Sequence, residues 1–235
     1  CTVYDQQLSE LKTFSVDKPV SCMTVFGDSV FIGTKEQVLI YNEEGVKTGK
    51  FPPLGEKAII TSIAVKNNAV FVADAGSKCI REYSPAGDLR RYIGKKDSLT
   101  GDEGFIIPSP YFDLDIGPDG FLWAVNPGKH QFQNYDKSGN IRGYWHKTSM
   151  RLDGFSGCCN PTHMAILEDG SFVTSEKGIC RVKIHNQAGD FVCVVATPQQ
   201  FDEGTTISDL AIDSKQNIYV LDPKREQLRV FMKKN

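Results

Sequence analysis

Two adjacent cysteines and a nearby histidine form the most reactive cluster in the sequence. Cys158 and Cys159 precede His163 by a few residues, and Cys180 follows a short turn further along the chain. Thiolate and imidazole groups bind soft metals and iron–sulfur clusters, whereas two of the thiols could instead form a disulfide between Cys180 and Cys158 or Cys159. The spacing is not a standard zinc pattern. The sequence therefore leaves three states open: a metal or cluster, a disulfide, and free thiols, which Lys177 would favour as thiolates if they are exposed.

A second set of polar residues stands immediately before five short apolar segments. Two of its members are carboxylates, one is an imidazole and one is a thiol, and such a set can hold a divalent metal. The alternative is a hydrated channel in which every polar group has a partner. The five residues are Cys22, Ser62, Asp113, His163 and Asp209.

A third set consists of polar residues that end the next apolar segment after each of these five short segments. An aspartate or asparagine at a strand end usually caps its own turn by bonding to the backbone. We expect this role for Asp74 and Asp222, whereas the longer Glu176 is a better candidate for contact with a ligand. Thr34 and Asn126 complete the set.

The loops beside these segments add three further polar candidates, which are His130, Asn160 and Lys177. The predicted ligand-binding residues are Asp113, Asn126, His130, Asn160, His163, Glu176, Lys177 and Asp209, and the candidate metal ligands are Cys158, Cys159, His163 and Cys180. A divalent ion is the cofactor that these residue types would suit, and no catalytic residue is assigned.

A recurring turn shows how these residues are positioned. An aromatic or histidine residue, followed four residues later by glycine, recurs at intervals of 37 to 52 residues. The glycine suits the positive φ of a tight hairpin. The positions followed by this glycine are Tyr41, Tyr83, Tyr135 and His185, and Tyr4 and Phe231 match the aromatic position without the glycine.

Two more segments recur ahead of each such turn. One is a short apolar segment such as 114–116, and the next alternates apolar and small residues and ends on a polar one, as 122–126 does. Four short strands per repeat of about 40–50 residues indicate a β-propeller. A β-sandwich would not repeat the same registers.

The repeats predict a single all-β domain over residues 1–235, built from four-stranded blades. Five inner strands are visible, and the segment Thr2–Val16 supplies only the outer half of a first, incomplete blade. The count is five blades if the given chain closes on itself, and six if strands precede it. In a propeller, equivalent residues of successive blades lie at one height around the channel, so the two polar sets above should meet at one channel mouth.

Composition and charge narrow the function. The net charge of −2 gives no electrostatic sign of nucleic-acid or membrane binding. No apolar run is long enough for a transmembrane helix. The seven cysteines are irregularly spaced and do not form a disulfide framework. We expect a monomer whose partner is a small molecule or a protein at the channel mouth.

The chain as given begins with Cys1 rather than methionine. A mature bacterial lipoprotein begins with cysteine, and a trimmed chain can begin with any residue. We expect a periplasmic or cell-envelope protein, with the cytoplasm as the alternative.

Several longer motifs resemble NHL repeats. The segments 72–78 and 219–223 are similar to single NHL repeats, and 107–113, 123–128, 157–161 and 174–178 together resemble a bacterial group of NHL-repeat proteins that has no assigned activity. The resemblance covers essentially the whole chain and implies a six-bladed propeller from a bacterium.

The chain departs from that group at cysteine positions. The group tends to carry cysteines where this chain has Ser156 and the segment 202–205, and proline where this chain has Cys180. If those cysteines hold a metal or cluster, the resemblance implies that this chain has lost part of the site.

A binding or scaffolding propeller is the leading functional prediction, because no complete catalytic constellation is visible and fold alone gives no function. One alternative is a metal-dependent propeller hydrolase or lyase, in which an ion held by Asp113, Asn126, His163, Glu176 and Asp209 activates water. Another is a redox protein that uses Cys158, Cys159 and Cys180.

Overall fold

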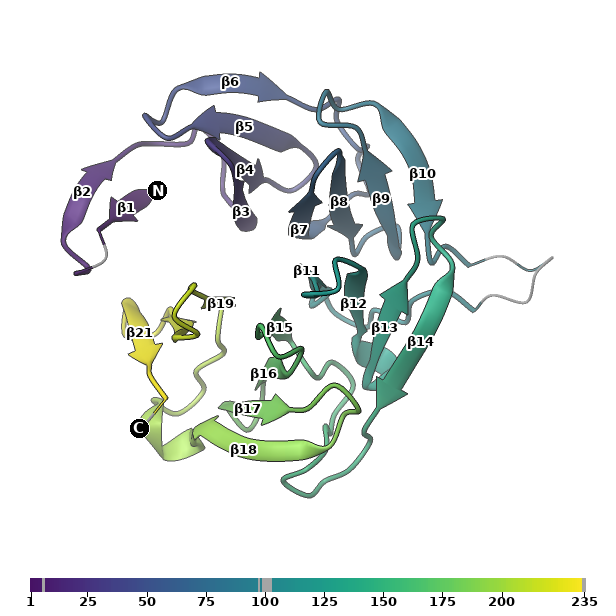
Figure 1. Cartoon of the computed structure of the whole chain (residues 1–235), viewed down its shortest axis with the longest axis vertical. Helices are drawn as coiled ribbons and strands as arrows, with labels where there is room; N and C mark the ends of the chain where they lie inside the picture. Colours follow the sequence, from purple (N-terminus) through teal and green to yellow (C-terminus); the bar gives the residue numbers. More distant parts are fainter. Residues whose placement is uncertain (6, 97, 99–102, 234–235) are drawn as a thin grey trace.

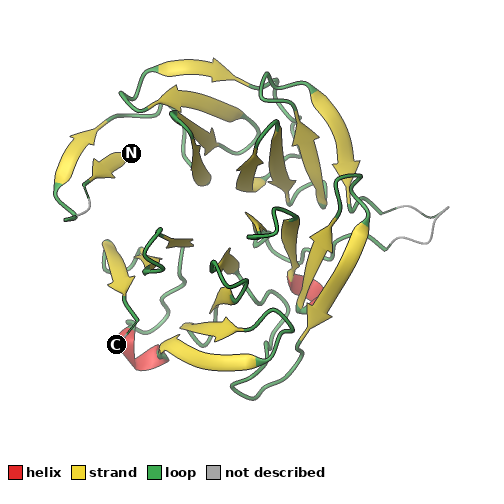
Figure 2. Cartoon of the chain, viewed as in Figure 1, coloured by secondary structure: helices red, strands yellow, loops and turns green. Residues whose placement is uncertain are grey.

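The computed structural model describes all residues except 6, 97, 99–102 and 234–235. The chain is a β-propeller, in which sheets stand side by side in a ring around a central channel (Figure 1). Among the described residues no helix is long and apolar enough to cross a membrane. The only regular non-strand elements described are two short 3-10 turns, Pro127–Lys129 and Pro198–Gln200 (Figure 2).

Four blades have four strands each, and every pair of neighbouring strands within them is antiparallel. The first is β3 (Cys22–Phe26), β4 (Ser29–Gly33), β5 (Val38–Asn42) and β6 (Lys47–Lys50). The second is β7 (Ile60–Lys66), β8 (Ala69–Asp74), β9 (Cys79–Tyr83) and β10 (Leu89–Ile93). The third is β11 (Leu114–Ile116), β12 (Leu122–Asn126), β13 (Gln131–Tyr135) and β14 (Ile141–His146). The fourth is β15 (His163–Ile166), β16 (Phe172–Glu176), β17 (Arg181–His185) and β18 (Phe191–Ala196).

Two further sheets are smaller. A three-stranded sheet holds β19 (Asp209–Ile212), β20 (Ile218–Asp222) and β21 (Gln227–Phe231), and a two-stranded sheet holds β1 (Thr2–Tyr4) and β2 (Glu10–Thr13). Five sheets therefore contain an inner strand. The predicted outer half-blade at Thr2–Val16 is confirmed as β1 and β2. The repeated aromatic or histidine position lies at the end of β1, β9, β13, β17 and β21, and one residue before the end of β5.

The predicted registers correspond to the strands of each blade. Alternation places apolar residues of the second strands between neighbouring sheets, where Val72 and Val125 are fully buried. The turn glycine that follows the third strand of each four-stranded blade has a positive φ, for example 92° at Gly87. A side chain at Gly87 would collide with Phe51 of the preceding blade, so this glycine also lets successive blades pack closely.

Side chains at the channel connect one inner strand to the next. The Oδ2 atom of Asp113 accepts a bond of 2.7 Å from the Met164 amide in the following blade, and Asp115 accepts one of 2.8 Å from the Ile166 amide. In the preceding blade, the Ser62 hydroxyl on β7 accepts a bond of 3.2 Å from the Leu114 amide on β11. These contacts satisfy amides at the edges of β11 and β15, which would otherwise have no strand partner.

Candidate functional site

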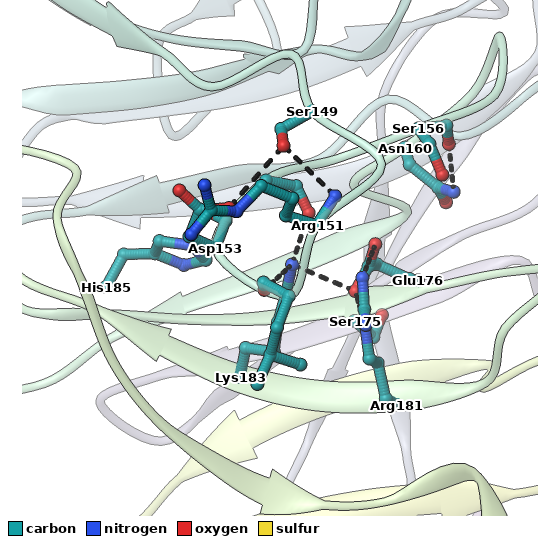
Figure 3. Close-up of polar contacts among 12 residues, drawn as sticks. Ser149, Arg151, Asp153, Ser156, Asn160, Ser175, Glu176, Arg181, Lys183 and His185 are labelled. Carbon is teal, nitrogen blue, oxygen red and sulfur yellow. Dashed lines mark hydrogen bonds and ion pairs between the residues drawn. The ribbon is translucent and has the colours of Figure 1, made fainter.

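The blade formed by β15–β18 carries a buried cluster of charged residues (Figure 3). The Glu176 carboxylate at the end of β16 pairs with Arg181 through two contacts, one of them 3.1 Å long, and with Lys183 at 3.0 Å. Arg181 and Lys183 are both on β17, where alternate residues point to the same face. Burial lowers the pKa of Lys183 to about 8, against the opposing effect of Glu176.

The same cluster fixes the long loop between β14 and β15. The Lys183 ammonium donates to the carbonyl oxygens of Gly154 (2.6 Å) and Leu152 (3.3 Å). His185, two residues further on β17, contacts the Asp153 carbonyl through Nε2 at 3.1 Å. Since the three Lys183 contacts match the three hydrogens of an ammonium group, this fully buried cation is satisfied.

A pocket lies directly beside this cluster. Its volume is about 370 Å³, and loop segments 156–160 and 176–179 form its walls. Asn160 holds the walls together, since its side chain accepts from the Lys177 amide (2.9 Å) and donates to the Ser156 carbonyl (2.7 Å). The predicted residues that line the pocket are Cys158, Asn160, Glu176 and Lys177.

Lys177 and the cysteine pair meet at the rim of this pocket. The Lys177 ammonium lies 3.3 Å from Ser109 Oγ and 4.8 Å from the centre of the Tyr111 ring. Ser109 Oγ in turn donates to Cys159 Sγ at 2.8 Å, and the Cys158 and Cys159 sulfurs are 3.1 Å apart. Within the described residues Lys177 has no carboxylate partner, so its charge faces the thiols and the pocket.

The first predicted polar set lies around the channel. Each of Asp113 and Asp209 accepts its neighbour's amide through Oδ1, at 2.9 Å and 2.8 Å, which gives the two blades matching geometry. Burial, with an added contribution from the Asp113 charge, raises the pKa of Asp209 to about 7. Burial also raises the pKa of Cys22 to about 12, and the negative charges of Asp209 and Asp113 contribute to this rise.

His163 also belongs to this polar set and has both a polar and an aromatic neighbour. Its Nδ1 atom is 3.2 Å from Ser175 Oγ, and its ring meets Tyr111 edge to face. Burial lowers the pKa of His163, although the Asp113 charge acts in the opposite direction. His163 therefore connects the channel to Tyr111, which Lys177 covers.

The remaining predicted residues bond within the protein. His130 contacts Thr148 Oγ1 at 3.0 Å and the Gly157 carbonyl at 2.6 Å. Asn126 accepts from the Ile106 amide at 2.9 Å, while its buried Nδ2 has no hydrogen-bond partner among the described residues. Both residues hold loops in place and do not line the pocket.

The turn-capping prediction is confirmed for the two aspartates. Asp74 Oδ1 accepts from the Ser77 amide at 3.1 Å, and Asp222 Oδ1 accepts from the Arg225 amide at 3.2 Å. Each is also close to an arginine seven residues later, Arg81 in one case and Arg229 in the other. Glu176 makes an equivalent ion pair to Arg181 instead of a cap, so its carboxylate is already paired.

The candidate metal ligands are not assembled into one site. In the part of the chain that the structure describes, no group of three or more His, Cys, Asp or Glu side chains could hold a metal ion. Cys180 packs among apolar residues such as Val182 and Ile207, and burial raises the pKa of its thiol to about 11. All seven cysteines are free, so the Cys180 disulfide expected as one alternative is not formed.

Two residues of this site were missing from the sequence prediction. Lys183 had no assigned role, although β17 alternates Arg181, Lys183 and His185 with apolar residues, which indicates a polar face whose charges need partners. Ser109 lies 50 residues before Cys159, and no local pattern reveals that contact.

Comparison with known proteins supports the fold. The chain matches no known family model, and no curated protein sequence matches it. Among solved structures it resembles virginiamycin B lyase from Staphylococcus aureus, with a TM-score of 0.63 and 11% identity, covering 99% of this chain and 76% of that one.

Two other solved structures are also similar. A protein of unknown function from Bacteroides caccae has a TM-score of 0.58 and 11% identity, covering 85% of this chain and 71% of that one. The extracellular domain of a putative hybrid two-component system from B. thetaiotaomicron has a TM-score of 0.59 and 10% identity, covering 99% of this chain and 31% of that one. At these identities the likeness concerns the fold alone, and it identifies the chain as an all-β propeller.

Proposed function

We propose that this chain is a binding propeller that holds a small anionic ligand in the pocket between segments 156–160 and 176–179. The observation that carries the proposal is the convergence of three predicted ligand-binding residues, Asn160, Glu176 and Lys177, on one pocket of about 370 Å³. A pocket with few, well-placed polar groups is the usual form of a small-molecule site.

The charges around the pocket favour an anion. Glu176 is balanced by two cations, Arg181 and Lys183, so this buried cluster carries a net positive charge. Lys177 adds an ammonium without a carboxylate partner among the described residues. A carboxylate or phosphate group on the ligand would complement both.

The metal-dependent alternative has less support from the same contacts. Both Asp113 oxygens accept backbone amides, and the Glu176 carboxylate is occupied by two cations. A metal ion would have to displace these partners. The residues present therefore do not fit a divalent-ion site of the hydrolase or lyase type, and we derive no metal-dependent step.

The proposal also includes blades of the bacterial NHL type and a sixth blade position. Asp74 with Arg81, and Asp222 with Arg229, repeat one spacing in two blades.

In Figure 1 the ring is open between β21 and the β1–β2 sheet. Asp113 Oδ2 accepts an amide of the next inner strand, whereas the Oδ2 atom of Asp209 has no such partner in the described chain. An inner strand at the sixth position would supply one. A periplasmic or cell-envelope location remains part of the proposal.

The binding proposal is tested with a set of small carboxylates and phosphate monoesters, measured by ligand-observed NMR. We expect some members to bind the unmodified protein and to lose about tenfold or more in affinity in Lys177→Met, since a hydrogen bond to a charged group contributes about 1.5–3 kcal/mol. Ile179→Trp should block the pocket sterically, because Ile179 is an exposed wall residue.

The control variants are Lys137→Met and Val46→Trp, which make the same changes at exposed positions outside the pocket. They should bind like the unmodified protein. Binding that is equal in all five proteins, or absent from the whole set, would contradict the proposal.

A further inference from the structure

The adjacent cysteines form an unusual pair. Their Sγ atoms are 3.1 Å apart, within hydrogen-bonding distance for thiols. Cys158 is exposed and lines the pocket, whereas Cys159 is only 1% exposed. One sulfur is therefore accessible to a molecule in the pocket, and the other lies directly behind it.

The buried sulfur has polar partners on its far side. Ser109 Oγ donates to Cys159 Sγ at 2.8 Å, and the Lys177 ammonium is 3.3 Å from the same Ser109 oxygen. A hydroxyl donor and a nearby cation stabilise a thiolate at Cys159.

The titration behaviour agrees with this geometry. Burial opposes ionisation, but hydrogen bonds from Ser109, Cys158 and Lys177 lower the pKa of Cys159 below its ordinary value. The pKa of Cys158 is raised, chiefly by its contact with Cys159. Cys159 is therefore the more acidic of the two thiols and loses its proton before Cys158 does.

We infer that Cys158 and Cys159 are a redox-active dithiol that reduces a low-molecular-weight disulfide and closes to a Cys158–Cys159 disulfide. This goes beyond ligand binding, because it needs no other ligand in the pocket. The nearby Lys177 favours a disulfide that carries carboxylates, such as glutathione disulfide.

The chemistry proceeds in two exchange steps. Cys158 passes its proton to Cys159 and attacks one sulfur of the substrate, so that its S–S bond breaks, a mixed disulfide forms and one thiolate leaves. Cys159 then loses that proton and attacks Cys158 Sγ, which releases the second thiolate. The protein gives up two electrons and the one thiol proton of this reacting form, and the two thiolates that leave take up that proton and one from water.

The second step needs only a short movement of the two sulfur atoms. The two sulfurs must approach from 3.1 Å to a bond length of about 2.0 Å. Cys180, the partner expected from the sequence, lies in an apolar cluster and has no such contact in the described structure. The adjacent residue is therefore the resolving thiol.

The test uses the whole protein, reduced and then exposed to glutathione disulfide, quenched with acid and digested with trypsin. Cleavage after Arg151 and Lys177 releases segment 152–177, which contains Cys158 and Cys159 and no other cysteine. We expect this segment to lose about 2 Da, the mass of two hydrogens, and to carry no glutathione.

The variants separate the roles of the two thiols. Cys159→Ser should keep a stable glutathione adduct on Cys158, because the resolving thiol is gone. In Lys177→Met trypsin cleaves after Arg181 instead and releases segment 152–181, which also contains Cys180. Closure, followed as the same loss of about 2 Da, should be about tenfold slower through a smaller thiolate fraction. Cys193→Ser, which removes an exposed lone cysteine, should leave the reaction unchanged. Circular dichroism checks that each variant is folded.

Three results would overturn the inference. They are a stable adduct on segment 152–177 in the unmodified protein, a cross-link from this segment to another cysteine, and equal closure rates in the unmodified protein and Lys177→Met. The binding proposal is tested with compounds that contain no disulfide, so failure of one does not imply failure of the other.

Discussion

Glu176 illustrates how the role of a single side chain depends on its partners. It ends β16 at a position where two other blades have a turn-capping aspartate, yet its longer side chain reaches Arg181 and Lys183. The carboxylate offsets part of the charge of two cations that would otherwise be buried without a carboxylate partner. Its contribution to the pocket is therefore to hold the wall segments in place and to leave Lys177 as the free charge.

Replacing this carboxylate should be costly for stability. Glu176→Gln leaves Arg181 and Lys183 buried without a compensating charge, and we expect the free energy of unfolding to fall by about 3 kcal/mol in urea titrations. Glu168→Gln, at an exposed turn position, should change it little. Similar losses in both variants would show that the cluster is not stabilising.

Asp209 gives a prediction for pH dependence. Its pKa of about 7 exceeds the ordinary value of about 3.9, so the folded protein keeps a proton that the unfolded chain has lost. The stability that this group contributes is present below the ordinary pKa and is lost as pH rises through about 7.

We therefore expect Asp209→Asn to lose less stability than the unmodified protein between pH 4 and 7, as measured by urea midpoints at about one-unit pH intervals. The Asn side chain can still accept the Leu210 amide. Asp28→Asn, in an exposed turn, is the control. If Asp209→Asn followed the same pH profile as the unmodified protein, the raised pKa would be refuted.

Among the structural elements, the loop between β14 and β15 depends most on contacts from another strand. Lys183 and His185 on β17 bind its carbonyl oxygens at residues 152–154, and the pocket wall at 156–160 continues from this segment. The position of the wall thus depends on β17 as well as on contacts within the loop, such as that of Asn160 with the Ser156 carbonyl.

Removing the ammonium should loosen this loop. Lys183→Met loses the bonds to Leu152 and Gly154, and we expect trypsin to cut after the exposed Arg151 several-fold faster under native conditions. Lys215→Met, at an exposed turn, serves as the control. Unchanged cleavage in Lys183→Met would mean that other contacts hold the loop.

The strands were predictable from the sequence, and the contacts between blades were not. Alternation and recurring turns located all five inner strands and the turn glycines, because each signal lies within one hairpin. The contact of Ser109 with Cys159, and that of Asp113 with the Met164 amide, join residues about 50 positions apart. Their alignment depends on how neighbouring blades pack, which no local pattern specifies.

For the molecule as a whole, the ring arrangement concentrates polar groups in two places. Asp113, His163 and Asp209 line the channel, where they connect or face inner strands. Cys158, Asn160 and Lys177 line a pocket beside the fourth complete blade. From the sequence we predicted that both groups of residues lie at one channel mouth. In the structure Tyr111 connects the channel to the pocket through its contacts with His163 and Lys177.

The central claim is that segments 156–160 and 176–179 form the ligand-binding site. The most direct measurement is a titration of isotope-labelled protein with an anionic compound that binds, followed through backbone amide chemical shifts. We expect the largest shifts at Gly157, Cys158, Gly178 and Ile179, and their loss in Ile179→Trp. Shifts centred elsewhere, such as around Arg142 and Tyr144 on β14, would contradict it.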